Sequence, residues 1–303
     1  MKYLVVGSGG VGSSIGGFLS ANGEDVTFIA RGAHLDKLRN EGLRITSGIK
    51  GELNIFPVSA FKSTEYDEKA DVIFVCVKSY SLSEIVPFIK KAAHKNTLVI
   101  PILNGIGNGD KIYNEFKDAF ILDGCIYIVA YMKESGHIVQ TGDIFKLVFG
   151  ARKGQQVPLD LLNDVKVSLE NSGIKAVVSI DIERDTFTKF SFISAYASCG
   201  AYYNITSKEM QQEGIYRQTF KELVAEFNNI AAAIGIDFDR DILDYNVKLL
   251  DAMDPDSTAS MQKDIKAGKN TEMDGICFDV VRLSEKYGVN VPRFRVIAEK
   301  FGY

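Results

Sequence analysis

The sequence has 303 residues, with 35 Lys and Arg against 39 Asp and Glu, which leaves a formal net charge of −4. At ~150 residues per domain, this length predicts about two domains. A slightly acidic chain has no global field that would hold a polyanion, so nucleic acid is not expected as a partner. Charged residues make up 24% and hydrophobic residues 46% of the chain, which is typical of a globular protein and unlike a disordered one.

No segment of the sequence is expected to interact with a membrane. The longest stretch without a formal charge, residues 190–207, is too polar to span a bilayer. The N-terminus becomes glycine-rich at Gly7 and has no signal-peptide pattern. The four cysteines are scattered without a CxxC pair, which favours reduced thiols over a disulfide framework or a metal site. We therefore expect a soluble, cytoplasmic protein that binds no metal.

In the first half of the chain, short apolar runs alternate with amphipathic stretches. The runs Tyr3–Val6, Val26–Ile29, Val72–Val77 and Leu98–Leu103 predict strands, and helices are predicted from Gly12 to Ala21, at His34–Asn40 and at Leu82–Ala93. Strands that alternate with helices predict right-handed crossovers and a parallel sheet. From Phe120 to Phe149 the pattern becomes β-type around a turn at Glu134–Gly136, which predicts hairpins that extend this sheet.

The last third of the chain has a helical pattern. Helices are predicted at Asp181–Tyr203, Tyr216–Ala233, Asp239–Asp251 and Thr271–Tyr287, with glycines near several of their ends. We therefore predict an α/β Rossmann-type N-terminal domain with a mostly parallel sheet in residues 1–180. An all-α C-terminal domain is predicted in residues 181–303.

A glycine-rich motif follows the first predicted strand. Gly7-Ser8-Gly9-Gly10-Val11-Gly12 has the form GxGxxG and opens a predicted helix, which is the context that a dinucleotide fingerprint requires. Gly7 would permit the tight turn, and Gly9 would let the backbone approach a pyrophosphate. Gly12 would let the helix pack closely on the strand, while the N–H groups at the helix start favour phosphate. The alternative is a glycine-rich turn without a ligand.

Basic residues follow the second and third predicted strands of the sheet. An NAD site usually has Asp or Glu after the second strand, where it accepts hydrogen bonds from the ribose. This chain has Arg31 there, and Lys78 follows the strand at Val72–Val77. A guanidinium can bind a 2′-phosphate with paired N–H donors, so the sequence favours NADP(H). The alternative is two solvated loop cations.

Lys189 is the candidate proton donor of the helical part. Hydride transfer from a nicotinamide requires a proton at the substrate oxygen, and His34, His94 and His137 fall where structural or exposed roles are favoured. Lys189 lies among aromatic and aliphatic residues, and burial lowers the pKa of an ammonium toward neutrality. Alternatively, its stem lies on apolar surface while the ammonium reaches water.

Two further segments carry polar candidates. Glu272 lies at an expected helix start, where the helix dipole would by itself favour a carboxylate. Ser260 lies four residues before Asp264, and this pair can also be interpreted as an ordinary polar face of a helix.

Taken together, these positions resemble the ketopantoate reductase (2-dehydropantoate 2-reductase) family. The resemblance implies that Asn104 lies beside nicotinamide and substrate, that Lys189 donates the proton, that Ser260 binds the substrate carboxylate and that Glu272 lies by substrate and cofactor. The matching segments are, in chain order, Gly7–Gly12, Ala30–Arg31, Val77–Lys78, Leu103–Gly107, Thr188–Phe190, Ser260–Ile265, Asn270–Asp274 and Val291–Pro292.

The chain departs from the family pattern on the predicted helix of Lys189. Family members that act on ketopantoate carry Asn four and eight residues after the lysine, whereas this chain has Ile193 and Ala197. Neither side chain can hydrogen-bond a substrate. The nearest hydroxyls, Ser194 and Ser198, are one residue further on and point ~100° around the helix. Loss of such a contact can redirect specificity.

The resemblance therefore predicts an NADPH-dependent reduction of 2-dehydropantoate to pantoate, a step of pantothenate biosynthesis, with Lys189 as proton donor. One alternative is a reductase of a different small 2-oxo acid, which Ile193 and Ala197 favour. Another is a protein that senses NADPH without catalysis. The expected partners are a small-molecule substrate and, if the protein is not a monomer, a second copy in a homodimer.

Overall fold

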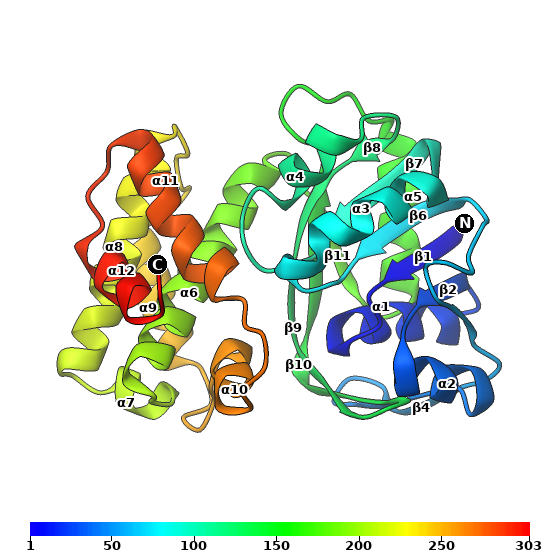
Figure 1. The fold of residues 1–303 in the computed structure, drawn as a ribbon, viewed down its shortest axis with the longest axis horizontal. Helices are drawn as coiled ribbons and strands as arrows, with labels where there is room; N and C mark the ends of the chain where they lie inside the picture. Colours follow the sequence, from blue (N-terminus) through cyan, green and yellow to red (C-terminus); the bar gives the residue numbers. More distant parts are fainter. The chain divides into compact units, whose positions relative to one another are not determined.

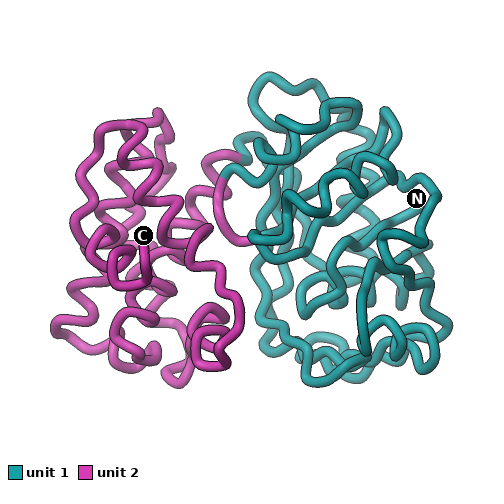
Figure 2. Tube along the Cα trace, in the orientation of Figure 1, with its two compact units in different colours: residues 1–103, 107–182 teal, residues 104–106, 183–303 magenta.

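The computed structural model describes all 303 residues, which divide into two compact units. Unit 1 comprises residues 1–103 and 107–182, and unit 2 comprises residues 104–106 and 183–303 (Figure 2). The segment Asn104–Ile106 follows unit 1 in sequence but packs with unit 2. No helix has both the length and the apolar character needed to cross a bilayer.

A six-stranded parallel sheet forms the centre of unit 1 (Figure 1). Its strands run in the order β5-β2-β1-β6-β7-β8, namely Ser59–Phe61, Asp25–Ile29, Lys2–Val6, Ala70–Val75, Ala93–Pro101 and Phe120–Ile121. Alternate residues of β1 belong to different cores, with Tyr3 and Val5 in one and Leu4 and Val6 in the other. Burial on both faces explains why these strands are continuous apolar runs.

Helices cover both faces of this sheet. They are α1 (Gly10–Ala21), α2 (Gly32–Asn40), α3 (Leu82–Ala92), α4 (Asn108–Glu115) and α5 (Leu159–Asn171). Helix α3 buries Leu82, Val86 and Ile89 in the core that contains Leu4. Helix α5 buries its apolar side chains in the opposite core. The predicted α/β fold of this part is confirmed.

A second sheet lies on the other side of α1, so the prediction that the hairpins extend the first sheet is wrong. It contains β11-β10-β3-β4 in that order, with β9 paired to β10. These strands are Lys175–Val178, His137–Gly150, Leu43–Ser47, Gly51–Ile55 and Asp123–Glu134. Strand β10 is long enough to pair with β9 along one edge and with both β3 and β11 along the other.

Glycines let α1 lie between the two sheets. An added Cβ would lie 2.4 Å from the Phe28 ring at Gly16 and 2.3 Å from Ile45 Cδ1 at Gly17. Phe28 belongs to the first sheet and Ile45 to the second, so α1 is in close contact with both. Because its two opposite faces are buried, the helix contributes to one core shared by both sheets.

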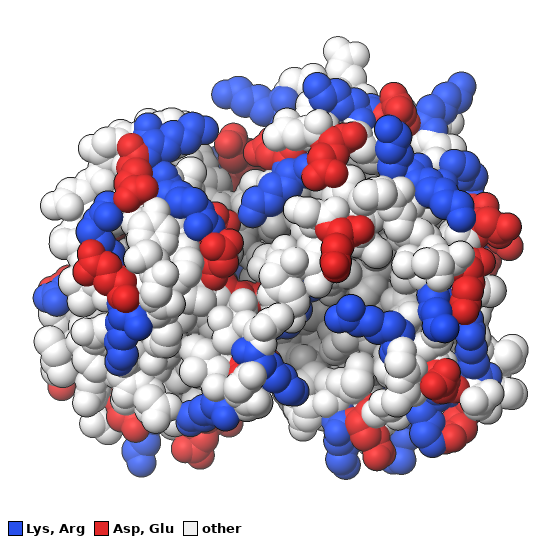
Figure 3. Space-filling view, in the orientation of Figure 1, with Lys and Arg blue, Asp and Glu red and all other residues white.

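Unit 2 is helical, as predicted. Its helices are α6 (Ile182–Tyr203), α7 (Ser207–Gln211), α8 (Ile215–Ala233), α9 (Ile242–Asp251), α10 (Ser260–Lys266), α11 (Asp279–Tyr287) and α12 (Pro292–Lys300). Helix α8 contributes a stripe of fully buried side chains at helical spacing, which comprises Phe220, Leu223, Phe227 and Ile230. On the face drawn in Figure 3, basic and acidic side chains are interspersed.

The helical run predicted at Thr271–Tyr287 begins two residues later than expected, at Met273. The Thr271 hydroxyl accepts a hydrogen bond from the Met273 N–H at 3.3 Å, which is a turn. A π-helical turn, η2, then covers Asp274–Phe278 before α11 begins. A threonine side chain that bonds nearby backbone competes with helical hydrogen bonding, and this explains the later start.

Candidate functional site

Three of the predicted residues lie at the carboxyl edge of the first sheet. Gly7 follows β1, Arg31 follows β2 and Lys78 follows β6, and these parallel strands are adjacent in the order β2-β1-β6. The chain winds in one direction from β1 to β2 and β5, and in the other from β6 to β7 and β8. The switch point therefore lies between β1 and β6, where open α/β sheets bind their ligands.

The glycine motif has the geometry of a phosphate-binding loop. Gly7 has φ +97°, and an added Cβ would lie 2.8 Å from the Val77 nitrogen beyond β6. At Gly12 an added Cβ would lie 2.1 Å from the Gly7 carbonyl oxygen. At Gly9 it would meet no protein atom within 4 Å. Gly7 and Gly12 are therefore required by the fold, whereas Gly9 faces open space.

The N-terminus of α1 can bind an anion at this loop. Its N-cap is Gly9, which supplies no side-chain cap, and the first intrahelical bond runs from the Ser13 N–H to the Gly9 carbonyl at 2.9 Å. The carbonyl of the buried Ser8 accepts a hydrogen bond from the Ser13 hydroxyl at 2.7 Å, which links the loop to the first turn of α1. N–H groups of a first helical turn that lack internal partners are donors for phosphate. The residues present therefore fit the pyrophosphate of a dinucleotide.

The basic residues at the same edge differ in exposure. Arg31 is the N-cap of α2, has extended backbone and exposes its side chain without an ion pair. Lys78 is half-buried and precedes the 3-10 turn η1 (Ser79–Ser81). No carboxylate follows β2, where a dinucleotide site that prefers a free 2′-hydroxyl has one.

His34 is a structural residue of this edge. It lies on α2, is buried, and its Nδ1 accepts a hydrogen bond from the Gly136 N–H at 3.0 Å. Gly136 lies in the turn between β9 and β10. The ring therefore links α2 to the second sheet, which agrees with the structural role expected from the sequence.

Burial lowers the pKa of His34 below its ordinary value of 6.5. The folded state therefore disfavours the protonated ring, and the stability from neutral His34 is present above pH 6.5 and is lost as pH falls through the lowered pKa. We expect Tm to fall below pH 6.5 in the wild type and less steeply in His34→Gln. Thermal unfolding of both proteins from pH 5 to 8 would check this, and parallel curves would contradict it.

Lys189 and Asn104 form a direct contact within unit 2. The Lys189 Nζ donates a hydrogen bond to the Asn104 Oδ1 at 3.0 Å, and both side chains are half-buried. Asn104 follows β7 by three residues, and Ile106 holds this segment in the helical core. A residue that continues from the edge of the first sheet thus contacts the predicted proton donor.

Aromatic packing holds the start of α6, which carries Lys189. Phe187 and Phe190 are buried and lie 5.6 and 5.5 Å, ring centre to ring centre, from Phe227 of α8. Because these two rings are fixed in the core, α6 cannot rotate about its axis, and the direction in which the Lys189 side chain leaves the helix is fixed.

The other predicted residues of unit 2 lie at element starts. Ser260 is the first residue of α10 and is exposed. Glu272 precedes η2 and is only 3% exposed, so it differs from a solvated residue of a first helical turn. Deep burial of a carboxylate costs free energy unless polar groups meet it, which favours a specific role over the dipole explanation alone.

Ser194 and Ser198 cannot replace the missing amides. Both side chains are fully buried on the core side of α6, whereas Ile193, close to the face of Lys189, is half-buried. On the same core side, the Ser191 hydroxyl accepts a hydrogen bond from Asn246 Nδ2 of α9 at 2.8 Å. Ile193, one turn after Lys189, therefore offers a substrate an apolar side chain and no hydrogen bond.

Comparison with known proteins assigns the family. The model described as "Ketopantoate reductase PanE/ApbA" matches residues 3–154, and its C-terminal counterpart matches residues 181–302. The chain belongs to this family. It is an oxidoreductase of the ketopantoate reductase family, which acts on small molecules and uses a nicotinamide cofactor.

Relatives of the ketopantoate reductase family match along the whole chain. A 2-dehydropantoate 2-reductase of Pyrococcus abyssi is 31% identical and covers 96% of this chain and 94% of its own. An uncharacterized oxidoreductase of Bacillus subtilis, YkpB, is 28% identical and covers 96% and 95%. A D-mandelate dehydrogenase solved with NADH and anilino(oxo)acetate has a TM-score of 0.89 at 22% identity, covering 99% of this chain and 96% of its own, and shares the fold.

Proposed function

We propose that this protein is an NADPH-dependent reductase of a small 2-oxo acid, with 2-dehydropantoate as the first substrate to test. The observation that carries the proposal is the 3.0 Å hydrogen bond between Lys189 Nζ and Asn104 Oδ1. The bond joins the only lysine of α6 to Asn104. Asn104 lies in the segment that follows β7, at the carboxyl edge of the first sheet, where sheets of this type bind nucleotides. An ammonium held there can donate a proton to a carbonyl that is being reduced.

The chain's residues have separate tasks in this proposal. The loop of residues 7–12 holds the pyrophosphate through the N–H groups at the start of α1, and Arg31 with Lys78 holds the 2′-phosphate. NADPH, when bound, supplies a hydride for the ketone carbon. Lys189 donates its proton to the substrate oxygen as negative charge develops there. The amide of Asn104 orients the Lys189 ammonium and lies beside the nicotinamide and the substrate.

Two residues of unit 2 complete the substrate site. Ser260 would donate its hydroxyl proton to a carboxylate oxygen of the 2-oxo acid. Glu272 would orient the substrate and the Lys189 ammonium, and its burial suits a carboxylate that works in a site with little water. Loss of either residue should weaken binding or orientation without removing the proton donor.

A second candidate is a reductase of a 2-oxo acid without a hydroxyl on its side chain. The observation that favours it is the replacement of both family amides on this helix, since Ile193 is a half-buried apolar side chain one turn after Lys189 and Ala197 is buried in the helical core. Neither can hydrogen-bond a substrate hydroxyl, whereas a site built for such a contact rejects analogues that lack it. Ketopantoate therefore has no expected advantage there over an aliphatic or aromatic 2-oxo acid.

Steady-state NADPH oxidation distinguishes the two candidates. The assay compares kcat/KM for ketopantoate with the values for branched aliphatic and aryl 2-oxo acids. A preference of ~10²-fold or more for ketopantoate would support the first candidate, and the reverse order would support the second. Binding of NADPH without its oxidation by any 2-oxo acid would contradict both.

Arg31→Ala should weaken NADPH binding by ~10-fold or more, because a charge-assisted contact with the 2′-phosphate is lost. NADH has no such phosphate, so its Kd should stay within a factor of two or so. Titration of cofactor fluorescence measures both constants. Lys37→Ala, an exposed cation of the same helix, is the control and should change neither. Equal weakening of both cofactors by Arg31→Ala would contradict the assignment.

A further inference from the structure

One face of α6 joins Lys189 to the segment that leads into α10. Tyr196 and Gly200 lie 7 and 11 residues after Lys189, which is about two and three helical turns, so all three residues share a face. The Tyr196 hydroxyl donates a hydrogen bond to the Ser257 carbonyl at 3.0 Å. This contact holds the chain three residues before Ser260.

Gln262 makes the second contact between this face and α10. Its side chain is 3% exposed, and its Nε2 donates to the Ile205 carbonyl, just beyond α6, at 2.8 Å. Its Oε1 accepts from the Ala259 N–H at 3.0 Å, which caps the start of α10. An added Cβ on Gly200 would lie 2.4 Å from this Oε1, so only glycine leaves room for the amide.

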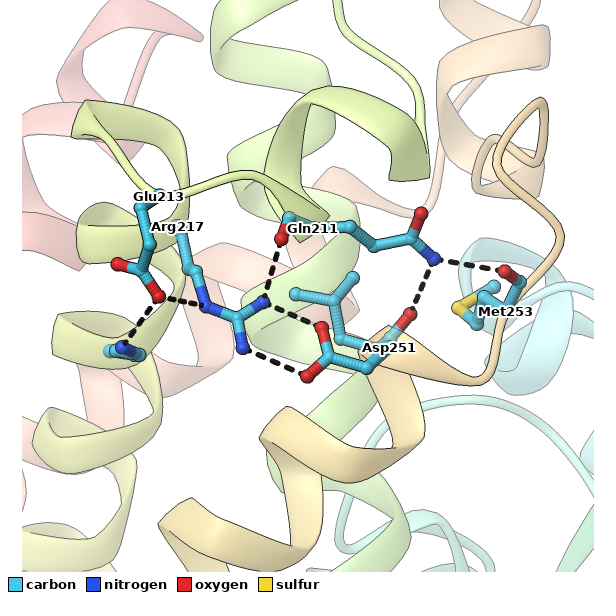
Figure 4. A network of polar contacts seen from close by, with 7 residues as sticks. Gln211, Glu213, Arg217, Asp251 and Met253 are labelled. Atoms are coloured by element: carbon cyan, nitrogen blue, oxygen red, sulfur yellow. Dashed lines mark hydrogen bonds and ion pairs between the residues drawn. The ribbon is translucent and has the colours of Figure 1, made fainter.

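Other contacts hold the chain that precedes Ser260. The Arg217 guanidinium binds both carboxylate oxygens of Asp251 at 2.6 and 2.8 Å, and the Gln211 amide donates to the carbonyls of Leu250 and Met253 (Figure 4). Next along the chain, the Pro255 carbonyl accepts from the Lys208 N–H at 2.8 Å. The backbone on both sides of Ser260 is therefore fixed while Ser260 itself stays exposed.

We propose that Gln262 is a positioning residue that acts through Ser260. Its amide packs against Gly200 and thereby fixes the start of α10. This places the Ser260 hydroxyl at a set position relative to the face of α6 that carries Lys189. The carboxylate of the 2-oxo acid then binds Ser260 while its carbonyl oxygen meets Lys189. The inference rests on the proposed role of Ser260 in substrate binding.

A double-mutant cycle in the full-length protein tests this inference. Gln262→Met keeps the volume but removes both hydrogen bonds, and we expect KM for the 2-oxo acid to rise about tenfold with kcat within a factor of three or so. Ser260→Ala should raise KM similarly. Adding Gln262→Met to Ser260→Ala should raise KM no further, because the two residues act as one unit. The pH profile of kcat, which reports the proton donor, should stay unchanged.

Two further variants separate positioning from stability. Gly200→Ala displaces the amide from the other side and should reproduce the KM effect, so it replaces Gln262→Met if that variant does not fold. Glu226→Gln changes another buried side chain, which accepts the backbone N–H groups of Arg293 and Phe294. As the control, it should lower Tm and leave KM unchanged.

Each outcome has a distinct meaning. If Gln262→Met lowers Tm without raising KM, or if its effect on KM multiplies with that of Ser260→Ala, the inference is overturned and the proposed function stands. If Ser260→Ala itself leaves KM unchanged, the proposed role of Ser260 in substrate binding is wrong, and the inference falls with it.

Discussion

Lys189→Ala should lower kcat for the 2-oxo acid by ~10²-fold or more, which is the usual scale for loss of a general acid. NADPH should bind with an unchanged Kd, because the residues proposed to hold its phosphates lie elsewhere in the sequence. Stopped-flow measurement of NADPH oxidation and equilibrium titration of NADPH check the two statements separately.

Two control variants narrow the interpretation of this result. Lys189→Arg keeps the positive charge beside Asn104, but a guanidinium does not release its proton, so this variant should be about as inactive as the alanine variant. Lys166→Ala removes a half-buried lysine of α5 that pairs with Glu170, and it should leave turnover unchanged. Turnover by Lys189→Ala within a factor of a few of the wild type would remove Lys189 from the mechanism.

Gly12→Ala should destabilise the fold and abolish NADPH binding. The added Cβ would lie 2.1 Å from the Gly7 carbonyl oxygen, a backbone atom that cannot rotate away. Helix α1 must then move off β1, and overpacking of this kind costs about 1–3 kcal/mol. Denaturant unfolding measures the free energy, and fluorescence titration measures the loss of binding.

Gly9→Ala is the matched variant because its Cβ would meet no protein atom within 4 Å. Its backbone, at φ −75°, suits alanine, so the free energy of unfolding should change by less than ~1 kcal/mol. NADPH binding should still weaken by ~10-fold or more, since the methyl group would occupy the approach of the pyrophosphate. Unchanged NADPH affinity in Gly9→Ala would show that the phosphate does not approach this residue.

Four strands of the first sheet, β1, β2, β6 and β7, and the glycine motif could be predicted because their signals are local, whereas the short edge strands β5 and β8 were not predicted. A strand buried on both faces needs a continuous apolar run, and such runs mark β1, β6 and the end of β7. The positive φ of Gly7 and the close contact between Gly12 and the Gly7 carbonyl likewise arise within one strand-turn-helix unit, whereas the contact of Gly7 with Val77 depends on β6. The long helices α6 and α8 follow from periodicity over many residues.

The second sheet could not be predicted because strand pairing is a non-local choice. The β9–β10 hairpin is visible in the sequence, but nothing in it states which edge of which sheet it joins. That choice depends on β3, which is 90 residues or more away and pairs with His137–Gln140 of β10. It also depends on α1, whose glycines admit a sheet on either side.

The candidate site also has features that local sequence signals predict and features that depend on non-local packing. Residue types and spacing alone indicated the glycine motif and the basic residues after β2 and β6, since each is a property of a short segment. For Lys189 they left an ammonium that reaches water as the alternative, and the resemblance to the family made this lysine the candidate proton donor. Only the tertiary structure decided that Lys189 meets Asn104, 85 residues earlier in the chain, and that Ser194 and Ser198 are buried. It also decided that Gly200 receives the Gln262 amide. Contacts of this kind depend on how whole helices pack, and packing is set by the shape of the entire core rather than by any local pattern.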